Sequence, residues 1–171
     1  MTTAIIVSVL VAALGSALVG GIFYAFSSFV MKALSHIPAA HGISAMQSIN
    51  IVVLNRSFLG LFLGTAVMSV LISVYALSHW QMASAPYWLA GAAAYLLGTF
   101  AVTAIGNVPL NDRLAIAEPA SDEAARLWRE YLTRWTWLNT VRTAAAISAT
   151  VMYVLGFVRL GASLSPNPLA G

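Results

Sequence analysis

Five side chains in the last third of the chain have a spacing that could do chemistry. Trp128, Tyr131, Trp135, Asn139 and Arg142 are three, four, four and three residues apart. These intervals bring side chains to one face of an α-helix. Aromatic rings that lead to an amide and a guanidinium would suit a flat ligand with a polar edge, so we expect a binding site on this face.

Arg142 stands about five residues inside an apolar segment, where an ionised side chain is costly unless it is paired or hydrated. The alternative interpretation is an aromatic belt at the membrane surface, with an arginine that extends toward water. We favour the site, because a belt gives no role to Asn139 beside Arg142.

The stretch "AIGNVPLNDRLA", residues 104–115, is polar after a long apolar run. Gly106 and Pro109 are expected to end a membrane helix there, with Asn107 and Asn111 at its mouth. Non-helical backbone at membrane depth is tolerated only where protein buries it or where it faces a water-filled cavity. The alternative is an ordinary helix end exposed to water.

This stretch also supplies candidate partners for the guanidinium of Arg142. We expect Asp112, Glu118 or Asn107 to pair with it.

Other polar residues could face the same ligand. Gln47 and Asn50 share a helical face, where they either hydrogen-bond a ligand or hold their segment against the rest of the protein. Tyr24 and Tyr95 are the two hydroxyls in the membrane segments that could face a cavity.

The composition indicates an integral membrane protein. Of 171 residues, 60% are hydrophobic and 8% are charged, whereas soluble domains carry about a quarter charged residues. The net charge of +3 comes from scattered basic residues, so we expect no nucleic-acid partner. The chain has no cysteine, which excludes thiolate chemistry.

Four stretches are long enough to cross a bilayer, which needs roughly 20 apolar residues. We therefore predict an all-α, four-helix membrane bundle, with a short helix in each of two long connections, 35–57 and 107–136. Residues 1–160 form one domain and residues 161–171 a flexible tail. The predicted spans are about 4–34, 58–80, 87–106 and 137–158.

The basic residues also predict an orientation. Most of them fall on the side of the two long connections, which the positive-inside rule places in the cytoplasm. We expect the cytoplasmic (plasma) membrane, with both termini outside and lipid as the main surroundings. A homo-oligomer is left open.

No motif indicates a cofactor. The histidines show no HxxxH or HxxE pattern, and no dinucleotide fingerprint or P-loop occurs. We expect His36, His41 and His79 to lie at the membrane surface. Haem or metal binding through His36 or His41 stays open, and the cofactor is unknown.

Four motifs together resemble one family: "FYAFSSFVMKAL", "AMQSINIVVLNRSFL", "GNVPLNDRLA" and "WREYLTRWTWLNTVRT". It is a family of small four-span membrane proteins, largely of unassigned function, that includes the anthrone oxygenases. The resemblance covers roughly residues 15–155. It departs from the expected pattern at Lys32, where we expect proline, and at Thr140, where many members have histidine.

The resemblance implies oxidation of an activated aromatic methylene to a ketone by molecular oxygen. In that scheme Arg142, Asn139 and Asn107 are catalytic, with Arg142 and Asn139 stabilising a developing oxyanion. The residues expected to bind a small lipophilic aromatic substrate are Trp128, Tyr131, Trp135, Asn111, Gln47, Asn50 and Tyr24. The alternative function is a non-catalytic binding protein, or a small subunit of a membrane complex.

Overall fold

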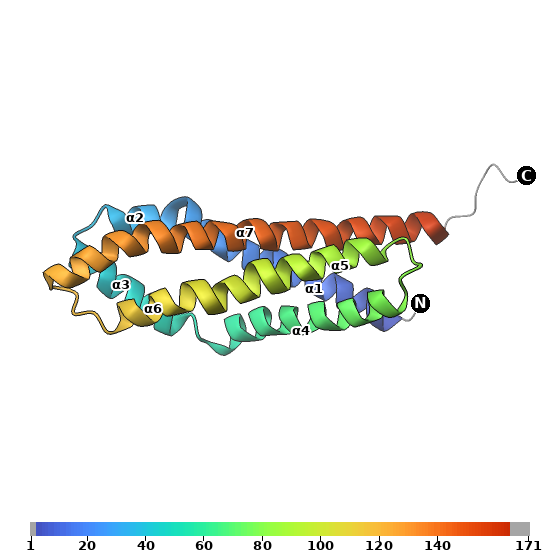
Figure 1. Cartoon of the computed structure of the whole chain (residues 1–171), viewed down its shortest axis with the longest axis horizontal. Helices are drawn as coiled ribbons and strands as arrows, with labels where there is room; N and C mark the ends of the chain where they lie inside the picture. The colour runs from blue at the N-terminus through green and yellow to red at the C-terminus, as the bar shows by residue number, and fades with distance from the viewer. Residues whose placement is uncertain (1–2, 165–171) are drawn as a thin grey trace, which may run out of the picture.

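The computed structural model describes residues 3–164, and all the regular structure in this range is helical. Long antiparallel helices lie side by side, and the first and last helices have their outer ends at the same end of the bundle (Figure 1). The elements in chain order are α1 (Thr3–Ala25), η1 (Phe26–Val30), α2 (Met31–Ser35), α3 (Ala39–Val52), α4 (Arg56–Ser78), α5 (Ala85–Ala93), η2 (Ala94–Ala101), η3 (Thr103–Asn107), α6 (Val108–Ala115) and α7 (Asp122–Leu164).

Four continuous helical stretches are long and apolar enough to cross a membrane, in agreement with the predicted four-helix membrane bundle. They are Thr3–Ser35, Arg56–Ser78, Ala85–Ala115 and Asp122–Ala162. The first four residues of the expected tail, 161–164, belong to α7. The remainder of that tail lies outside the described residues.

The second connection differs from the expectation. Gly106 and Pro109 do not end the third helix, which continues to Ala115. Pro109 falls in the first turn of α6, directly after the π-helical segment η3. A proline is tolerated in a first turn because its missing N–H is not needed there. The backbone at this depth is therefore helical, and the prediction of a break was wrong.

The second connection does not contain the separate short helix that we expected, because that segment is the first part of α7. Helix α7 begins at Asp122 and runs unbroken for 43 residues, about 65 Å at helical rise, whereas the hydrocarbon core of a bilayer is about 30 Å thick. Its start is capped as the sequence suggests, since the Ser121 hydroxyl accepts a 3.1 Å hydrogen bond from the N–H of Ala124. In the first connection, α3 is the predicted short helix.

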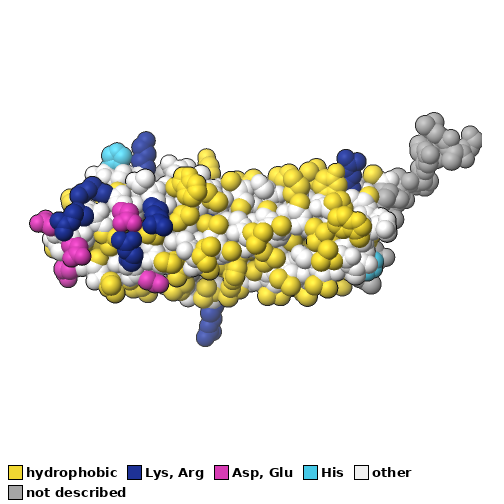
Figure 2. Space-filling model, viewed as in Figure 1, with side chains coloured by type: hydrophobic (Ala, Val, Ile, Leu, Met, Phe, Trp, Pro, Cys, Tyr) yellow, Lys and Arg dark blue, Asp and Glu magenta, His cyan; other side chains and the backbone are white. Residues whose placement is uncertain are grey.

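The bundle has two cores. One joins α1, α4, α5 and α7 along the apolar part, where the hydroxyl of Tyr95 donates to the carbonyl of Phe62 at 3.0 Å. The other packs α2, α3 and α6 against the start of α7, around Trp128, Tyr131 and Trp135. We call this second part the head. Most of the charged side chains in view gather over it, and hydrophobic side chains cover much of the rest (Figure 2).

Candidate functional site

A cavity of about 530 Å³ lies where the head meets the apolar bundle. This volume is within the range of small-molecule sites, about 300–1,000 Å³. Its wall is mostly apolar and includes Phe23, Phe26, Phe58, Phe62 and Trp135. The polar side chains that line it are Gln47, Asn50, Thr103, Asn111, Asp112 and Arg142.

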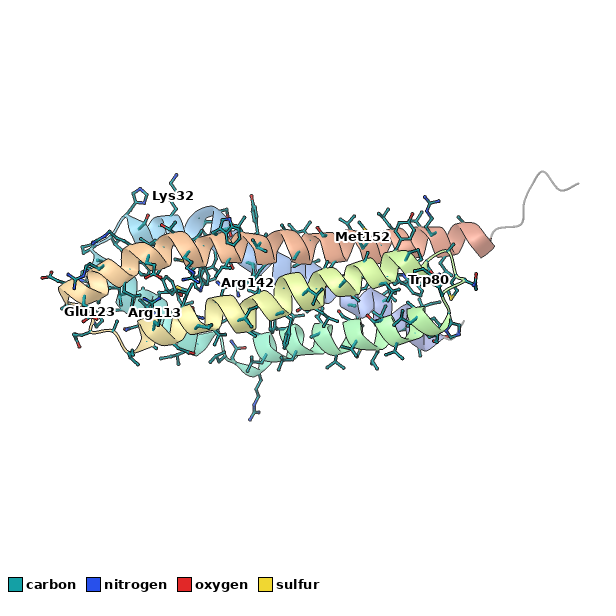
Figure 3. All side chains as sticks on the ribbon, viewed as in Figure 1. Lys32, Trp80, Arg113, Glu123, Arg142 and Met152 are labelled. Carbon is teal, nitrogen blue, oxygen red and sulfur yellow. The ribbon has the colours of Figure 1, made fainter. Side chains whose placement is uncertain are left out.

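Arg142 is the cation of this cavity and is only 4% exposed. It lies inside the bundle, between α7 and the helix that ends in α6 (Figure 3). Its Nη1 donates to Thr103 Oγ1 at 3.1 Å and its Nη2 donates to Asn139 Oδ1 at 2.6 Å. The guanidinium carbon lies 4.0 Å from the ring centre of Phe23 and 5.3 Å from that of Trp135.

The expected pairing of Arg142 with an acidic residue was wrong. The carboxylate ion pairs among residues 3–164 join Glu130 to Arg113 and to Arg134. Asp112 lines the cavity without a bond to Arg142, and Glu118 lies beyond the end of α6, at the surface of the head. Nε of Arg142 is buried with no hydrogen-bond partner.

A buried guanidinium carries five N–H donors, and two of them are used here by neutral oxygens. The aromatic faces of Phe23 and Trp135 contribute some stabilisation. No carboxylate among residues 3–164 compensates the charge, so the site presents an oriented cation to whatever occupies the cavity.

Asn139 holds this cation in place and does not itself line the cavity. Its Nδ2 donates to the carbonyl of Phe23 at 2.6 Å and to Ser27 Oγ at 2.7 Å, while Oδ1 accepts from Arg142. The amide is fully buried. Asn139 is thus a positioning residue that fixes α7 against α1 and the guanidinium against the cavity.

Asn107 is also buried away from the cavity lining. Its Nδ2 donates to the carbonyl of Trp135 at 3.3 Å, and its Oδ1 has no hydrogen-bond partner. It therefore braces the segment of α7 that carries Trp135, and it does not bond to Arg142.

The aromatic face of α7 forms a stack. Ring centres of Trp128 and Tyr131 are 5.6 Å apart, and those of Tyr131 and Trp135 are 5.7 Å apart, with nearly parallel planes in both pairs. Only Trp135 of the three reaches the cavity, because the other two are packed in the head. Asn111 organises the end of the stack, since its Oδ1 accepts from the Tyr131 hydroxyl at 2.7 Å and from Trp135 Nε1 at 2.8 Å.

Gln47 and Asn50 both hold α3 against the rest of the protein and line the cavity. Gln47 Nε2 donates to the carbonyls of Leu114 and Ala117, at 2.9 Å each, and so ties α3 to the end of α6. Asn50 donates to the Tyr131 hydroxyl at 3.4 Å. Both side chains also line the cavity.

The expectation for Tyr24 is corrected. Its side chain is 59% exposed on the outside of α1 and is absent from the cavity lining. Phe23, one residue earlier, is the side chain that points inward. A helical turn with no strong polar–apolar contrast gives little indication of which neighbour faces the core, and this part of α1 is apolar on all sides.

Thr103 belongs to the site although its position in the sequence did not single it out. It lies in an apolar run, where its hydroxyl donates to the carbonyl of Thr99 at 2.8 Å. It reaches Arg142 only because α7 packs beside η3. Thr140 is exposed and lies 3.0 Å from Ser27 Oγ, so the position where the resemblance has histidine lies outside the cavity lining.

The histidines lie away from the cavity. His36 is exposed, with Nδ1 2.6 Å from the carbonyl of Lys32, and His41 is exposed as well. His79 is at the end of α4, where its Nδ1 lies 3.0 Å from the carbonyl of Tyr75. No group of three or more His, Cys, Asp or Glu that could hold a metal ion occurs in the part of the chain that the structure describes.

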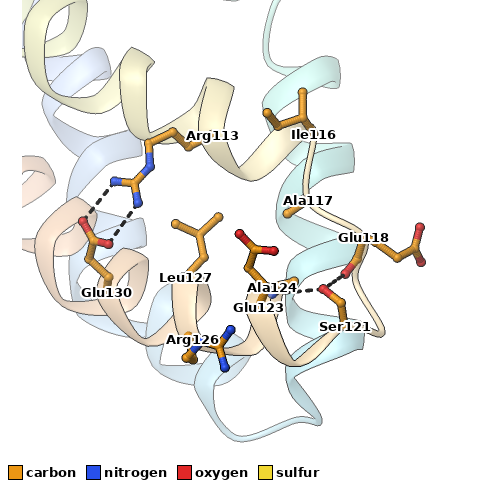
Figure 4. A pocket seen from close by; sticks show the side chains of 10 residues that line it. All are labelled: Arg113, Ile116, Ala117, Glu118, Ser121, Glu123, Ala124, Arg126, Leu127 and Glu130. Atoms are coloured by element: carbon orange, nitrogen blue, oxygen red, sulfur yellow. Dashed lines mark hydrogen bonds and ion pairs between the residues drawn. The ribbon is translucent and has the colours of Figure 1, made fainter.

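A second hollow, of about 720 Å³, lies on the surface of the head (Figure 4). Arg113 and Glu130 form a two-pronged pair across it, with both N–O distances 3.1 Å. These side chains are about half exposed, 51% and 42%. The charged side chains that line this hollow are all exposed, so it lacks the buried charge that marks the first cavity.

Comparison with known proteins adds one match. A family model described as anthrone oxygenase matches residues 53–152, more than half of the chain. The matched segment contains Thr103, Asn111, Trp135, Asn139 and Arg142 and begins after Gln47 and Asn50. No curated protein and no solved structure matches the chain.

Proposed function

The chain belongs to the anthrone oxygenase family, and on this premise we propose that it is a membrane-embedded oxidoreductase that oxidises a flat, lipophilic aromatic substrate with molecular oxygen. In the overall reaction a ring CH₂ becomes C=O. One atom of dioxygen enters the ketone, and the other leaves as water with the two methylene hydrogens. The carbon loses four electrons, and dioxygen accepts them.

The observation that carries this proposal is the uncompensated Arg142. Loss of a methylene proton from an anthrone places negative charge on the carbonyl oxygen across the ring. Arg142 has three N–H donors beyond those bonded to Thr103 and Asn139. Donors held in place before charge develops stabilise it most effectively in a site that excludes water. Arg142 is thus the group that binds the enolate oxygen.

The cavity walls fit the rest of such a substrate. Phe58 and Phe62 are stacked on one another at 5.8 Å, and Phe26 lies 5.7 Å from Trp135. Aromatic walls bind fused rings by apolar contact and by offset or edge-on ring packing. Gln47, Asn50 and Asn111 place amides around the polar edge.

The rival function is a binding protein or complex subunit, and it predicts that the buried polar groups satisfy one another. Asn139 meets that expectation, since its oxygen and nitrogen are all bonded. Arg142 does not, because its Nε has no partner and no carboxylate within residues 3–164 forms an ion pair with it. This difference favours the oxygenase.

We also propose the orientation. The head carries most of the Lys and Arg side chains, including Lys32, Arg113 and Arg126, and the positive-inside rule places it in the cytoplasm. The start of α1 and the end of α7 then lie outside, and the membrane is the plasma membrane. The cavity sits at the level where the head meets the bilayer.

The test is dioxygen uptake by the detergent-purified protein with an anthrone, with an absorbance spectrum and metal analysis of the same sample. Arg142→Met should remove uptake while the protein stays folded, and Arg159→Met should not. Arg159 is a suitable control because it is exposed at the other end of the bundle, where its Nε donates to the Tyr87 hydroxyl.

A colourless, metal-free protein that neither consumes dioxygen nor binds an anthrone would overturn the proposal in favour of the rival. A Soret band would direct attention to His36 and His41 instead.

A further inference from the structure

We infer that Asp112 is the proton acceptor of this cavity, the group that removes hydrogen from the substrate methylene. The inference rests on the proposed function and adds a second catalytic residue to Arg142. It depends on where Asp112 lies, on its lack of other partners, and on the need of the reaction for a base.

Asp112 is the one carboxylate that lines the cavity within the described range, as Arg142 is the one cation. Its side chain is exposed and makes no hydrogen bond or ion pair with another residue of 3–164. The neighbouring Arg113 is occupied by Glu130 outside the cavity, in the head. The carboxylate of Asp112 is therefore available to a ligand.

Arg142 and Asp112 reach the cavity from separate places. Thr103, which contacts Arg142, lies nine residues before Asp112 on one continuous helix, and both line the cavity. Side chains on a helix lean toward its N-terminus, so that of Asp112 leans back toward Arg142. The carbonyl and the methylene of an anthrone lie on opposite sides of its central ring. A cation and a base at separate points of one lining therefore suit the two groups.

Other bases are less well placed. None of the three histidines lines the cavity, and Thr140 faces away from it. The Tyr131 hydroxyl is committed to Asn111. Glu118 lines the separate hollow on the head. General-base catalysis needs a group within hydrogen-bond reach of the proton, and Asp112 is the carboxylate that lines this cavity within the described range.

The proton transfers balance as follows. The first C–H bond breaks, its proton goes to the Asp112 carboxylate, and its electron pair forms the enolate held by Arg142. The enolate carbon bonds to dioxygen, and Asp112 returns the proton to the outer oxygen, which gives a hydroperoxide. Asp112 then takes the second C–H proton, that electron pair forms the C=O bond, and the O–O bond breaks to release hydroxide. The hydroxide takes the proton from Asp112 and leaves as water.

The experiment separates this role from the oxygenase proposal. In D₂O without dioxygen, the wild-type protein should catalyse exchange of the anthrone methylene hydrogens for deuterium. Asp112→Asn should bind the anthrone as wild type does but lose about 100-fold or more of both exchange and dioxygen uptake, the usual effect of removing a general base. Asp122→Asn is the matched control, an exposed acid in the first turn of α7.

A second variant tests the chemistry directly. Asp112→Gly should be inactive and should regain exchange when formate is added, because a small carboxylate can occupy the vacated space. A structural role for Asp112 would show no such rescue.

The outcomes are distinguishable. If wild type and Asp112→Asn exchange and consume dioxygen equally, Asp112 is not the base and the oxygenase proposal stands. If the wild type neither binds an anthrone nor exchanges its hydrogens, both proposals fail.

Discussion

Arg142 and Asn139 are held together one helical turn apart. Nη2 of Arg142 donates to Oδ1 of Asn139 at 2.6 Å, and Nδ2 of the same amide donates to the carbonyl of Phe23 at 2.6 Å. The guanidinium is thereby fixed to α7 and, through Asn139, to α1. Catalytic groups that are oriented before the substrate binds do not have to be ordered during the reaction, so this small network should matter for both folding and turnover.

Asn139→Ala should therefore lower both the stability of the protein and its turnover. The substitution removes two donors and one acceptor that are buried, and it leaves one donor of Arg142 without a partner. Each buried group left unsatisfied costs about 1–3 kcal/mol. Thermal unfolding in detergent should show a larger loss than Asn55→Ala, an exposed helix cap whose removal costs about 1 kcal/mol. Equal losses would contradict the positioning role.

Asn111→Asp should slow the reaction without unfolding the protein. A carboxylate of the same shape can still accept from the Tyr131 hydroxyl and from Trp135 Nε1. It also adds a negative charge to the cavity lining, which should destabilise the enolate and leave binding of the neutral anthrone little changed. We expect kcat for the anthrone to fall about tenfold, or about 1.4 kcal/mol of activation free energy, with Tm unchanged. An unchanged kcat would place the enolate elsewhere.

Tyr131→Phe should lower the stability of the protein and raise KM, whereas Tyr24→Phe should change neither. The Tyr131 hydroxyl donates to Asn111 and accepts from Asn50, so its loss frees two polar groups of the cavity wall. Tyr24 is 59% exposed and bonds to none of them. The first variant should lose about 1 kcal/mol of stability, the typical net value of a hydrogen bond, and should raise KM. The second should match wild type in steady-state kinetics and in unfolding.

Gly98→Ala should destabilise the protein, because this glycine allows η2 and α7 to pack closely. A Cβ atom at Gly98 would lie 2.5 Å from Cβ of Ala145, so α7 and η2 would have to move apart. Overpacking of this kind typically costs about 1–3 kcal/mol. Gly60 is the control, because a Cβ there would meet nothing within 4 Å. Unfolding experiments should show a loss for Gly98→Ala and no loss for Gly60→Ala; the same result for both would mean that the close contact is unimportant.

The sequence by itself determined the membrane-spanning helical fold and the common face of Asn139 and Arg142. These features follow from local properties, since a 20-residue apolar run has few other stable structures and since helical spacing places Asn139 beside Arg142. The family resemblance likewise needed only the order of residues, and the family-model match supports it.

The tertiary structure decided what surrounds that face. Thr103 and Phe23 contact Arg142 only because η3 and α1 pack against α7, and the expected acidic partners lie elsewhere. Continuity through Pro109 depends on the π-helical segment before it, which changes the hydrogen-bond register without a signal in the residue types. The facing of Tyr24 was equally hidden, because the direction of a side chain on an apolar helix is set by its neighbours in space rather than by those in the chain.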